Sequence, residues 1–447
     1  MTKKVRFYDF DRLDEQSRGK LFSRTESDIS QFIEGVKPII DRVKNDGDDA
    51  LVYYAKEFDH SEITRDTIKA EPEDFERAFT TLEPELIESI QFAAHRIKAF
   101  HEDQLPETMR FSEQFPGVFA GDRFSPIPSV ACYVPRGKGS FPSVVMMTAI
   151  PAVVAKVDRV FIVTPPGPDG KIDDATLVAA RLAGVKDVYK CGGAQAVAAA
   201  AFGTETVPKA VKIVGPGSPW LIAAKRILAN IIDPGTPAGP SESLILADHT
   251  ANAQIAALDL IIESEHGPDS SAFLVTPSRE LADEVCSIIP ELWKQLGDLR
   301  AGYSSTVLGG ERGGVVVTKD IKQAIQFVND YAPEHLEVLT EDPFEYLGEL
   351  VNAGEILLGN HTPITIGNFV LGPNAVLPTS GRARTHSPLC VYDFLKMTSI
   401  GYVTSKAYPE LAEHAHRLAT YEGFDGHALA VSKLREHVLK TGTKLQK

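Results

Sequence analysis

The stretch Val157-Asp158-Arg159-Val160-Phe161-Ile162-Val163-Thr164 decides how this chain folds, because a short apolar run of this kind is typical of a buried β-strand. Further short apolar runs occupy 187–190 and 210–214, and Ala-rich segments of helical character occupy 174–183 and 195–202. This alternation of strand and helix predicts βαβ units around a mainly parallel sheet.

A second block of the same texture lies in the later half of the chain. Its short apolar runs occupy 243–247, 272–276, 314–318 and 355–358. Between the two blocks lies the Pro- and Gly-rich segment 233–240, which is the expected boundary between two lobes.

The two ends of the chain differ from these blocks. Residues 1–100 are predicted to be helical, with helices over 26–45 and 84–100, and the chain is predicted to turn helical again after Ser387. Residues 408–447 form a charged appendage that could pack on a neighbouring subunit or fold back on its own chain. We therefore expect four regions, namely 1–132, 133–240, 241–386 and 387–447.

The bulk composition restricts the class of partner. The 447 residues include 46 Lys and Arg against 61 Asp and Glu, a formal net charge of −15, which argues against binding to nucleic acid or to an anionic membrane. No apolar run approaches the roughly 18 residues of a membrane span, and the basic start of the chain lacks the apolar segment of a signal peptide. The four cysteines have no CxxC spacing and suit reduced thiols. These features predict a cytoplasmic protein.

The segment Ile262-Glu263-Ser264-Glu265-His266-Gly267-Pro268 is the first candidate for chemistry. It ends a run of apolar residues at helical spacing, and the i, i+3 separation of Glu263 and His266 places both side chains on one helix face, as a divalent metal requires. Gly267-Pro268 is expected to stop the helix, whose carboxyl end favours a cation. An exposed polar helix face is the competing interpretation.

Three glycine clusters, at 133–139, 192–195 and 215–218, each follow an expected strand. The last two open a helix, where free backbone amides can bind phosphate. None has the G-x-G-x-x-G spacing of a dinucleotide fingerprint, and each can also be no more than a tight turn.

These pieces, in this order, resemble the histidinol dehydrogenase family over essentially the whole chain. The resemblance implies an α/β fold with two incomplete Rossmann-like lobes, a helical amino-terminal region and a helical carboxy-terminal tail in an intertwined homodimer. It also implies one Zn²⁺ per active site and the oxidation of a primary alcohol through an aldehyde to a carboxylate with two NAD per turnover. The matching runs are Tyr133-Val134-Pro135, Gly192-Gly193-Ala194-Gln195-Ala196, Lys212-Ile213-Val214-Gly215-Pro216-Gly217, Ala238-Gly239-Pro240-Ser241-Glu242, Ala332-Pro333-Glu334-His335-Leu336-Glu337, Tyr392-Asp393-Phe394-Leu395-Lys396 and Glu422-Gly423.

The family's catalytic Glu-His pair falls on Glu334 and His335. His335 is then the general base toward the substrate hydroxyl, a task that an unperturbed pKa near 6.5 suits. Glu334 would activate the water that attacks the aldehyde. Pro333-Glu334 could instead be a simple helix start.

The family's zinc ligands, a Gln, two His and an Asp, fall on Glu263, His266, Asn368 and His427. Glu stands in place of Gln and Asn in place of Asp, so the formal ligand charge is unchanged. Since breaking a buried charge pair costs on the order of 3–5 kcal/mol, this balance indicates a retained metal site. A degenerate site without metal is the opposing interpretation.

The resemblance also assigns residues to the binding of the substrate and of the cofactor. It places Ser241 and Glu422 in the substrate pocket, and Tyr133, Gln195 and Ser218 on the cofactor side. Ser218 replaces the usual Asn of the family and could simply cap the following helix.

Substitutions near the substrate distinguish this chain from the family pattern. Ala375 stands where a substrate-contacting His is usual, and Arg382 and His386 add cations to a turn that is neutral in the family. The first glycine loop adds Arg136 and Lys138. Because arginine suits oxyanions, the pattern resembles the branch that oxidises 2,3-dihydroxypropane-1-sulfonate to sulfolactate. Arg382 or His386 is the expected sulfonate anchor, ahead of Arg136, unless these are only surface charges.

Three other functions fit the same motifs. The first is a histidinol dehydrogenase with altered ligands, and the second is a dehydrogenase of another small alcohol. The third is a catalytically silent paralogue that binds a metabolite or partner, against which the retention of Glu334, His335, His266 and His427 argues.

Overall fold

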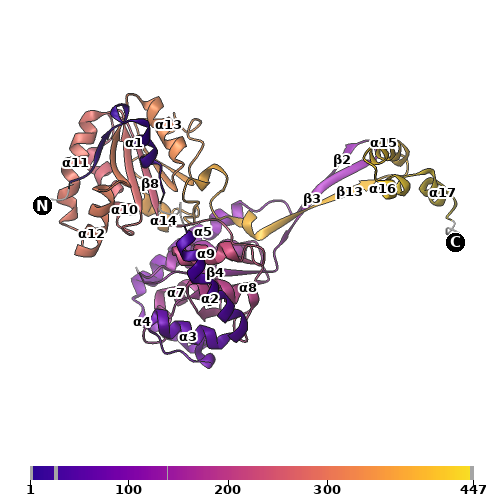
Figure 1. The fold of residues 1–447 in the computed structure, drawn as a ribbon, viewed down its shortest axis with the longest axis horizontal. Coiled ribbons are helices and arrows are strands. Elements are labelled where there is room, and N and C mark those ends of the chain that lie inside the picture. The colour runs from indigo at the N-terminus through magenta and orange to yellow at the C-terminus, as the bar shows by residue number, and fades with distance from the viewer. Residues whose placement is uncertain (1–3, 25–28, 138, 443–447) are drawn as a thin grey trace. The chain divides into compact units, whose positions relative to one another are not determined.

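The computed structural model of the chain describes residues 4–24, 29–137 and 139–442. These residues form two compact units, drawn as ribbons in Figure 1. Unit 1 contains the described residues of Met1–Leu105 and Pro126–Phe394, and unit 2 contains those of Pro106–Ser125 and Leu395–Lys447. Unit 1 holds two parallel sheets, one in each lobe, so the predicted α/β class is confirmed.

The first lobe is built on a four-stranded parallel sheet in the order β6-β5-β4-β7. The apolar runs form these strands because they are enclosed on both faces. Helices α2, α3, α8 and α9 pack on one face, while α6, with α5 and α7 against it, covers the other. The bounds are α2 (Ser30–Asp46), α3 (Asp48–Asp59), α4 (Pro72–Thr81), α5 (Pro84–Asp103), β4 (Ser129–Tyr133), α6 (Pro142–Val154), β5 (Arg159–Thr164), α7 (Asp174–Leu182), β6 (Val188–Lys190), α8 (Gly193–Phe202), β7 (Lys212–Val214) and α9 (Pro219–Ile227).

The second lobe is built on a six-stranded parallel sheet in the order β1-β10-β9-β8-β11-β12. Helices α10, α11 and α12 cover one face, and α13 covers the other. The prediction that residues 1–100 are helical is wrong at Phe7–Asp9, which pairs with β10 as the edge strand. The bounds are β1 (Phe7–Asp9), α1 (Glu15–Leu21), β8 (Glu242–Ala247), α10 (Ala253–Ser264), β9 (Ser271–Thr276), α11 (Arg279–Trp293), α12 (Asp298–Leu308), β10 (Gly313–Val317), α13 (Ile321–Tyr331), β11 (His335–Leu339), β12 (Glu355–Leu358) and α14 (Ile364–Phe369).

The alternation of side chains along β11 decides which residues can meet α10. Leu336 and Val338 belong to the core on the α13 face, whereas Leu339 belongs to the core on the α10 face. Since side chains alternate along a strand, His335 and Glu337 also point toward the α10 face.

Unit 2 consists of a three-stranded sheet in the order β13-β3-β2 and three helices. The tail expected to be helical after Ser387 therefore begins, within this unit, with the strand β13. The strand lacks a clear alternation because all nine of its residues are exposed or half-buried, with polar and apolar residues in mixed order. The bounds are β2 (Met109–Phe115), β3 (Val118–Pro126), β13 (Leu395–Val403), α15 (Tyr408–Tyr421), α16 (Asp425–Ala430) and α17 (Lys433–Thr441).

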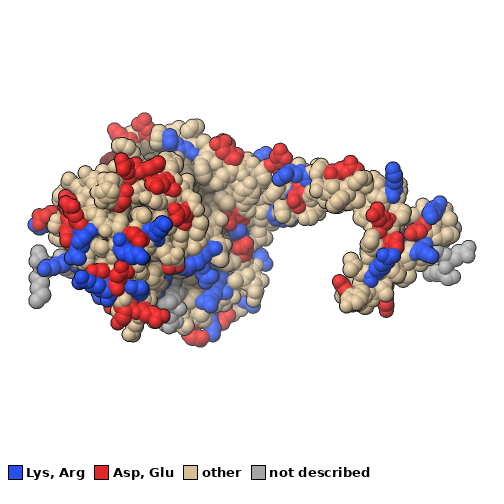
Figure 2. Space-filling view, turned by 90° about the horizontal axis from the view of Figure 1, so that it is seen from above, with Lys and Arg blue, Asp and Glu red and all other residues tan. Residues whose placement is uncertain are grey.

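The surface carries charges of both signs. Lys and Arg side chains are interspersed with Asp and Glu over the face seen in Figure 2. Within the described residues, the helices are too short or too polar to cross a bilayer.

His101 and Asn374 tie α5 of the first lobe to the segment after α14. The His101 side chain is fully buried, and its Nδ1 lies 2.8 Å from Gln104 Oε1. Asn374 Nδ2 lies 3.2 Å from His101 Nε2 and donates to the Met147 carbonyl at 2.6 Å. This pattern requires a neutral ring with its proton on Nδ1.

We expect His101 to make the stability of the fold depend on pH. Burial lowers its pKa below the usual 6.5, and the hydrogen bond to Gln104 offsets this only in part. The unfolded chain then binds a proton at higher pH than the folded chain, so the free energy of unfolding should fall as the pH drops below about 6.5. His101→Gln should remove up to about 1.4 kcal/mol per pH unit of this dependence. Urea unfolding of both proteins at pH 7 and pH 5 measures this pH dependence. If the free energy of unfolding changed equally between the two pH values in both proteins, the assignment would be contradicted.

Candidate active site

The candidate active site lies at the amino-terminal edge of the second-lobe sheet. Glu242, His335 and Glu355 begin the adjacent strands β8, β11 and β12. The last turn of α10 brings Glu263 to the same place, where it accepts a hydrogen bond from the Ser241 hydroxyl. Ligands of open α/β sheets usually bind at the carboxyl ends of the strands, so this site uses the opposite edge.

His335 is held between two acidic side chains. Its Nδ1 lies 2.6 Å from Glu355 Oε1, and its Nε2 lies 3.9 Å from Glu334 Oε2. The side chain is 4% exposed. The ring therefore has one nitrogen in a hydrogen bond and the other directed toward Glu334 without a bond to it.

Glu334 is fixed by backbone contacts on two sides. Its Oε2 accepts a hydrogen bond from the Glu242 amide at 2.9 Å, and its carbonyl accepts one from the Glu355 amide at 3.0 Å. Gly354 lies so close to this carbonyl that a Cβ there would be 2.5 Å from the oxygen. The alternative that Pro333-Glu334 starts a helix is wrong, because a strand begins at His335.

The acidic surroundings change the titration of the pair. Burial lowers the pKa of His335, but Glu334, Glu355 and Glu263 outweigh burial and raise it to about 10. Burial raises the pKa of Glu334 well above its usual value, with Glu263 adding to the effect and His335 opposing it. The expected unperturbed pKa of His335 is therefore wrong for the protein without bound ligands.

Glu263, His266 and Asn368 lie together as the metal hypothesis requires. Glu263 Oε1 accepts from Asn368 Nδ2 at 2.9 Å, and Glu263 Oε2 lies 3.3 Å from His266 Nδ1. α10 ends at Ser264, so His266 follows the helix rather than sharing its face, and the helix stops before Gly267.

Glu263 remains ionised although its side chain is only 1% exposed. Burial alone would raise its pKa, but the charges of His266 and His335 lower it. Hydrogen bonds from Asn368 and Ser241 act in the same direction, so the net shift is downward. A buried carboxylate beside an imidazole and a carboxamide is a donor set that fits a divalent cation such as Zn²⁺.

Unit 1 contains three of the four predicted metal ligands. Among the described residues, no three His, Cys, Asp or Glu side chains converge as a metal cluster. Asn368 contributes an amide, and the fourth predicted ligand, His427, lies in α16 of unit 2. The predicted substrate residue Glu422 follows α15 in the same unit, and both side chains are exposed.

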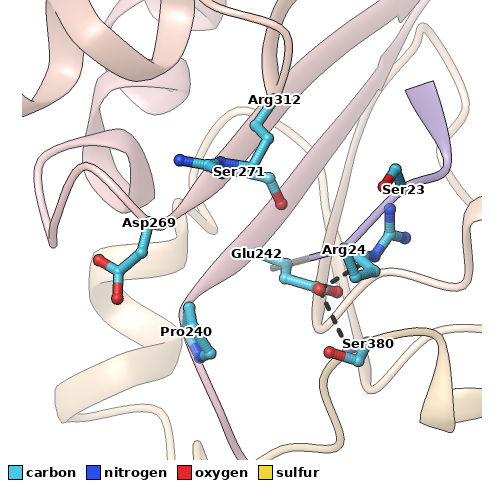
Figure 3. A pocket seen from close by; sticks show the side chains of 8 residues that line it. All are labelled: Ser23, Arg24, Pro240, Glu242, Asp269, Ser271, Arg312 and Ser380. Atoms are coloured by element: carbon cyan, nitrogen blue, oxygen red, sulfur yellow. Dashed lines mark hydrogen bonds and ion pairs between the residues drawn. The ribbon is translucent and has the colours of Figure 1, made fainter. Parts of the chain in front are cut away.

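A polar pocket lined by Glu242 contains residues that sequence reasoning missed (Figure 3). Arg24 Nε lies 3.0 Å from Glu242 Oε1, and the Ser380 amide donates to the same oxygen at 3.0 Å. The Arg24 guanidinium also stacks 3.4 Å from the centre of the Tyr331 ring. Glu242 ends the matched segment 238–242, whereas Arg24 carries no sequence signal of its own.

The expected anionic anchors occupy different places. Arg382 and His386 are exposed in the turn that begins at Ser380. His386 also lines a surface groove with Lys212. Arg136 donates to the Lys171 carbonyl at 3.1 Å in the first lobe, and Lys138 lies outside the described residues.

The cofactor candidates gather at the carboxyl edge of the first-lobe sheet. The Tyr133 hydroxyl accepts from the Gly193 amide at 3.2 Å, and a Cβ on Gly193 would be 3.0 Å from Gln195 Oε1. Gly215, with φ +116°, approaches the Tyr133 carbonyl so closely that a Cβ would be 2.2 Å from it. Ser218 stands at the start of α9 but makes no side-chain capping hydrogen bond, so capping does not explain it.

Comparisons with known proteins agree with this arrangement. A family model for histidinol dehydrogenase matches residues 22–435. A histidinol dehydrogenase homolog of Cereibacter sphaeroides is 59% identical over 437 residues, covering 98% of this chain and 99% of that protein. Histidinol dehydrogenase of Synechocystis is 44% identical over 435 residues, covering 97% and 100%. The crystal structure of histidinol dehydrogenase from Elizabethkingia anophelis matches with a TM-score of 0.92 at 33% identity, covering 98% of this chain and 99% of that one.

The fold and these matches define the class of protein. It is an α/β enzyme of the NAD-dependent dehydrogenases. The chain belongs to the histidinol dehydrogenase family.

We expect the metal site to need one negative charge, which either position 263 or position 368 can supply. Glu263→Gln removes the buried carboxylate beside His266 and should weaken Zn²⁺ binding by more than about 10-fold. Adding Asn368→Asp restores one negative charge, so the double variant should hold more Zn²⁺ than the single variant. Competition with a fluorescent chelator measures the affinities.

The neighbouring substitution Glu265→Gln is the matched control. It also removes a carboxylate, but the described hydrogen bond of the Asn368 side chain is to Glu263. Equal Zn²⁺ affinities for the single and double variants would show that the two positions do not compensate each other.

Proposed function

We propose that the protein is a zinc-dependent, NAD-linked dehydrogenase that oxidises a primary alcohol through an aldehyde to a carboxylate. The proposed substrate is an anionic diol, such as 2,3-dihydroxypropane-1-sulfonate, which would give sulfolactate. The observation that carries the proposal is the buried His335, whose Nε2 faces Glu334 at 3.9 Å on the same sheet edge as Glu263.

The side chains supply the acid–base chemistry. In each oxidation the hydroxyl proton of the substrate passes to His335 Nε2 as hydride leaves the carbon. Glu334, whose pKa is raised by burial, must likewise be deprotonated before it takes a proton from the water that adds to the aldehyde. When bound, NAD would accept the hydride and Zn²⁺ would hold and polarise the substrate oxygen.

His335 must lose its proton before it can act as a base. Burial lowers its pKa, but the negative charges of Glu334, Glu355 and Glu263 outweigh burial and raise it to about 10. A divalent cation held at Glu263 offsets one of these negative charges and so favours the neutral ring. We propose Glu263, His266, Asn368 and His427 as its ligands, with the amide of Asn368 turned to present oxygen.

One observation supports an anionic substrate. The turn that carries Arg382 and His386 is tied to the site, because the Ser380 amide donates to Glu242, whose own amide donates to Glu334. Glu422 and Ser241 are proposed to contact the substrate, and Tyr133, Gln195 and Ser218 the cofactor.

We also propose a homodimer that forms through unit 2. Within the described helices of this unit only Ala412 and Ala428 are buried, whereas Leu418 is 64% and Tyr421 is 92% exposed. Such a surface requires a partner to remove it from water.

Analytical ultracentrifugation should give about twice the 48.6 kDa of one chain, and Leu418→Asp should shift the protein toward monomer. A monomeric wild type would exclude this assembly.

The substrate is tested by NADH production from purified, zinc-loaded protein. Turnover of 2,3-dihydroxypropane-1-sulfonate with two NADH per substrate is the expected result, together with turnover of L-histidinol at least about 100-fold lower in kcat/KM, a difference of about 2.7 kcal/mol. The reverse preference would identify the biosynthetic reaction, and activity on neither would exclude both assignments.

The anchor is tested with the same assay. Arg382→Gln or His386→Asn should raise KM for the sulfonate by about 10-fold or more, since a charge-assisted contact contributes roughly 1.5–3 kcal/mol. Propane-1,2-diol, which lacks the anion, should be affected much less. Equal effects on both alcohols would remove these cations from substrate binding.

A further inference from the structure

We infer that Glu355 is a positioning residue for His335, holding the imidazole so that Nε2 faces the substrate. This inference rests on the proposed function only for the role of His335 as a base. The contact itself is a hydrogen bond of 2.6 Å between His335 Nδ1 and Glu355 Oε1.

Strand register brings the two side chains together. His335 and Glu355 are paired in the parallel ladder between β11 and β12, so their side chains project from the same face of the sheet. Both are enclosed, with 4% of the His335 side chain and 8% of the Glu355 side chain exposed. Water therefore competes little for this hydrogen bond.

α14 holds the Glu355 carboxylate from the other side. A Cβ added to Gly367 would lie 3.1 Å from Glu355 Oε1 and 3.4 Å from Oε2. The helix backbone thus approaches the carboxylate closely where glycine is present. The Glu355 amide meanwhile donates to the Glu334 carbonyl, which fixes the start of β12 against the catalytic segment.

This geometry selects one tautomer of the neutral ring. A carboxylate accepts hydrogen bonds but donates none, so it stabilises the proton on Nδ1 and leaves the lone pair on Nε2. Nε2 is the nitrogen that faces Glu334, at 3.9 Å. The same logic operates in catalytic triads, where an aspartate fixes the orientation and tautomer of the histidine.

The charged groups around the ring come from three elements. Glu334 faces it from the residue before β11, Glu355 from β12 and Glu263 from α10. Glu334 Oε2 lies 3.9 Å from His335 Nε2, which is too far for a hydrogen bond. Among the described contacts of the ring, only Glu355 is within hydrogen-bond distance. Orientation of the ring therefore depends on Glu355.

Glu337 provides a matched control, because it lies on the same strand and the same face as His335. Its side chain is fully buried and lies beside Asp259 of α10. Burial, followed by the charge of Asp259, raises its pKa to about 10. Since Glu337 is protonated at neutral pH, Glu337→Gln preserves both shape and charge.

The kinetic test compares Glu355→Gln, Glu355→Ala and Glu337→Gln with the wild type. Both Glu355 variants should lower kcat by about 10²- to 10⁴-fold and change KM by less than about threefold, because Glu355 does not touch the substrate. The Gln amide can donate to Nδ1 and so favours the tautomer that cannot act as a base. Glu337→Gln should retain wild-type kcat, and His335→Asn defines the lower limit.

A second measurement needs neither substrate nor activity. In protein with ¹⁵N-labelled histidine, the His335 signals, assigned with His335→Asn, are followed to a pH above the pKa of about 10, where the ring is neutral. There they should show the proton on Nδ1 in the wild type and on Nε2 in Glu355→Gln. An unchanged tautomer, or unchanged kcat in an active enzyme, would overturn the role of Glu355. If no alcohol is oxidised but the tautomer shifts as expected, the positioning role stands and the proposed function fails.

Discussion

The parallel pairing of β11 with β8 on one side and with β12 on the other is the constraint on which the candidate site depends. His335 is paired with Ser243 in one neighbour and with Glu355 in the other. These pairings bring three strand starts to a single edge, and the α10 face then receives His335, Glu355 and Glu263 together. A shift of one residue in the register would turn His335 toward α13 and separate it from every acidic partner.

Burying several carboxylates around one imidazole leaves the site with an electrostatic conflict. Burial raises the pKa of Glu334, while the charge of His266 helps to keep Glu263 ionised. The imidazolium of His335 partly compensates for the negative charge. The fold tolerates this because backbone amides and neighbouring side chains satisfy the carboxylates, and because a cation is expected at Glu263.

Much of the fold followed from local patterns, but contacts between distant segments did not. The apolar run at 355–358 was predicted as a strand and is β12, yet the sequence could not show that Glu355 pairs with His335, because strand order is not encoded locally. β1 was missed because three residues carry too little periodicity. β11 was missed because Pro333-Glu334 also fits the start of a helix.

The candidate site was partly predictable for the same reason. Glu263, His266, Glu334 and His335 belong to recognisable motifs, and the first two lie together with Asn368 as expected. Arg24 reaches Glu242 from a segment more than 200 residues away in sequence, so no spacing could reveal it. The pKa of His335 depends on Glu355 and therefore could not be predicted without the register.

The turn that begins at Ser380 has a consequence for how this scaffold can diversify. Its first backbone amide is tied to the buried frame through Glu242, while the side chains of Arg382 and His386 are exposed. Both side chains are exposed, so substitutions at these two positions leave the packing of both sheets untouched. An ancestral enzyme could exchange one class of alcohol for another here while its acid–base machinery remained intact.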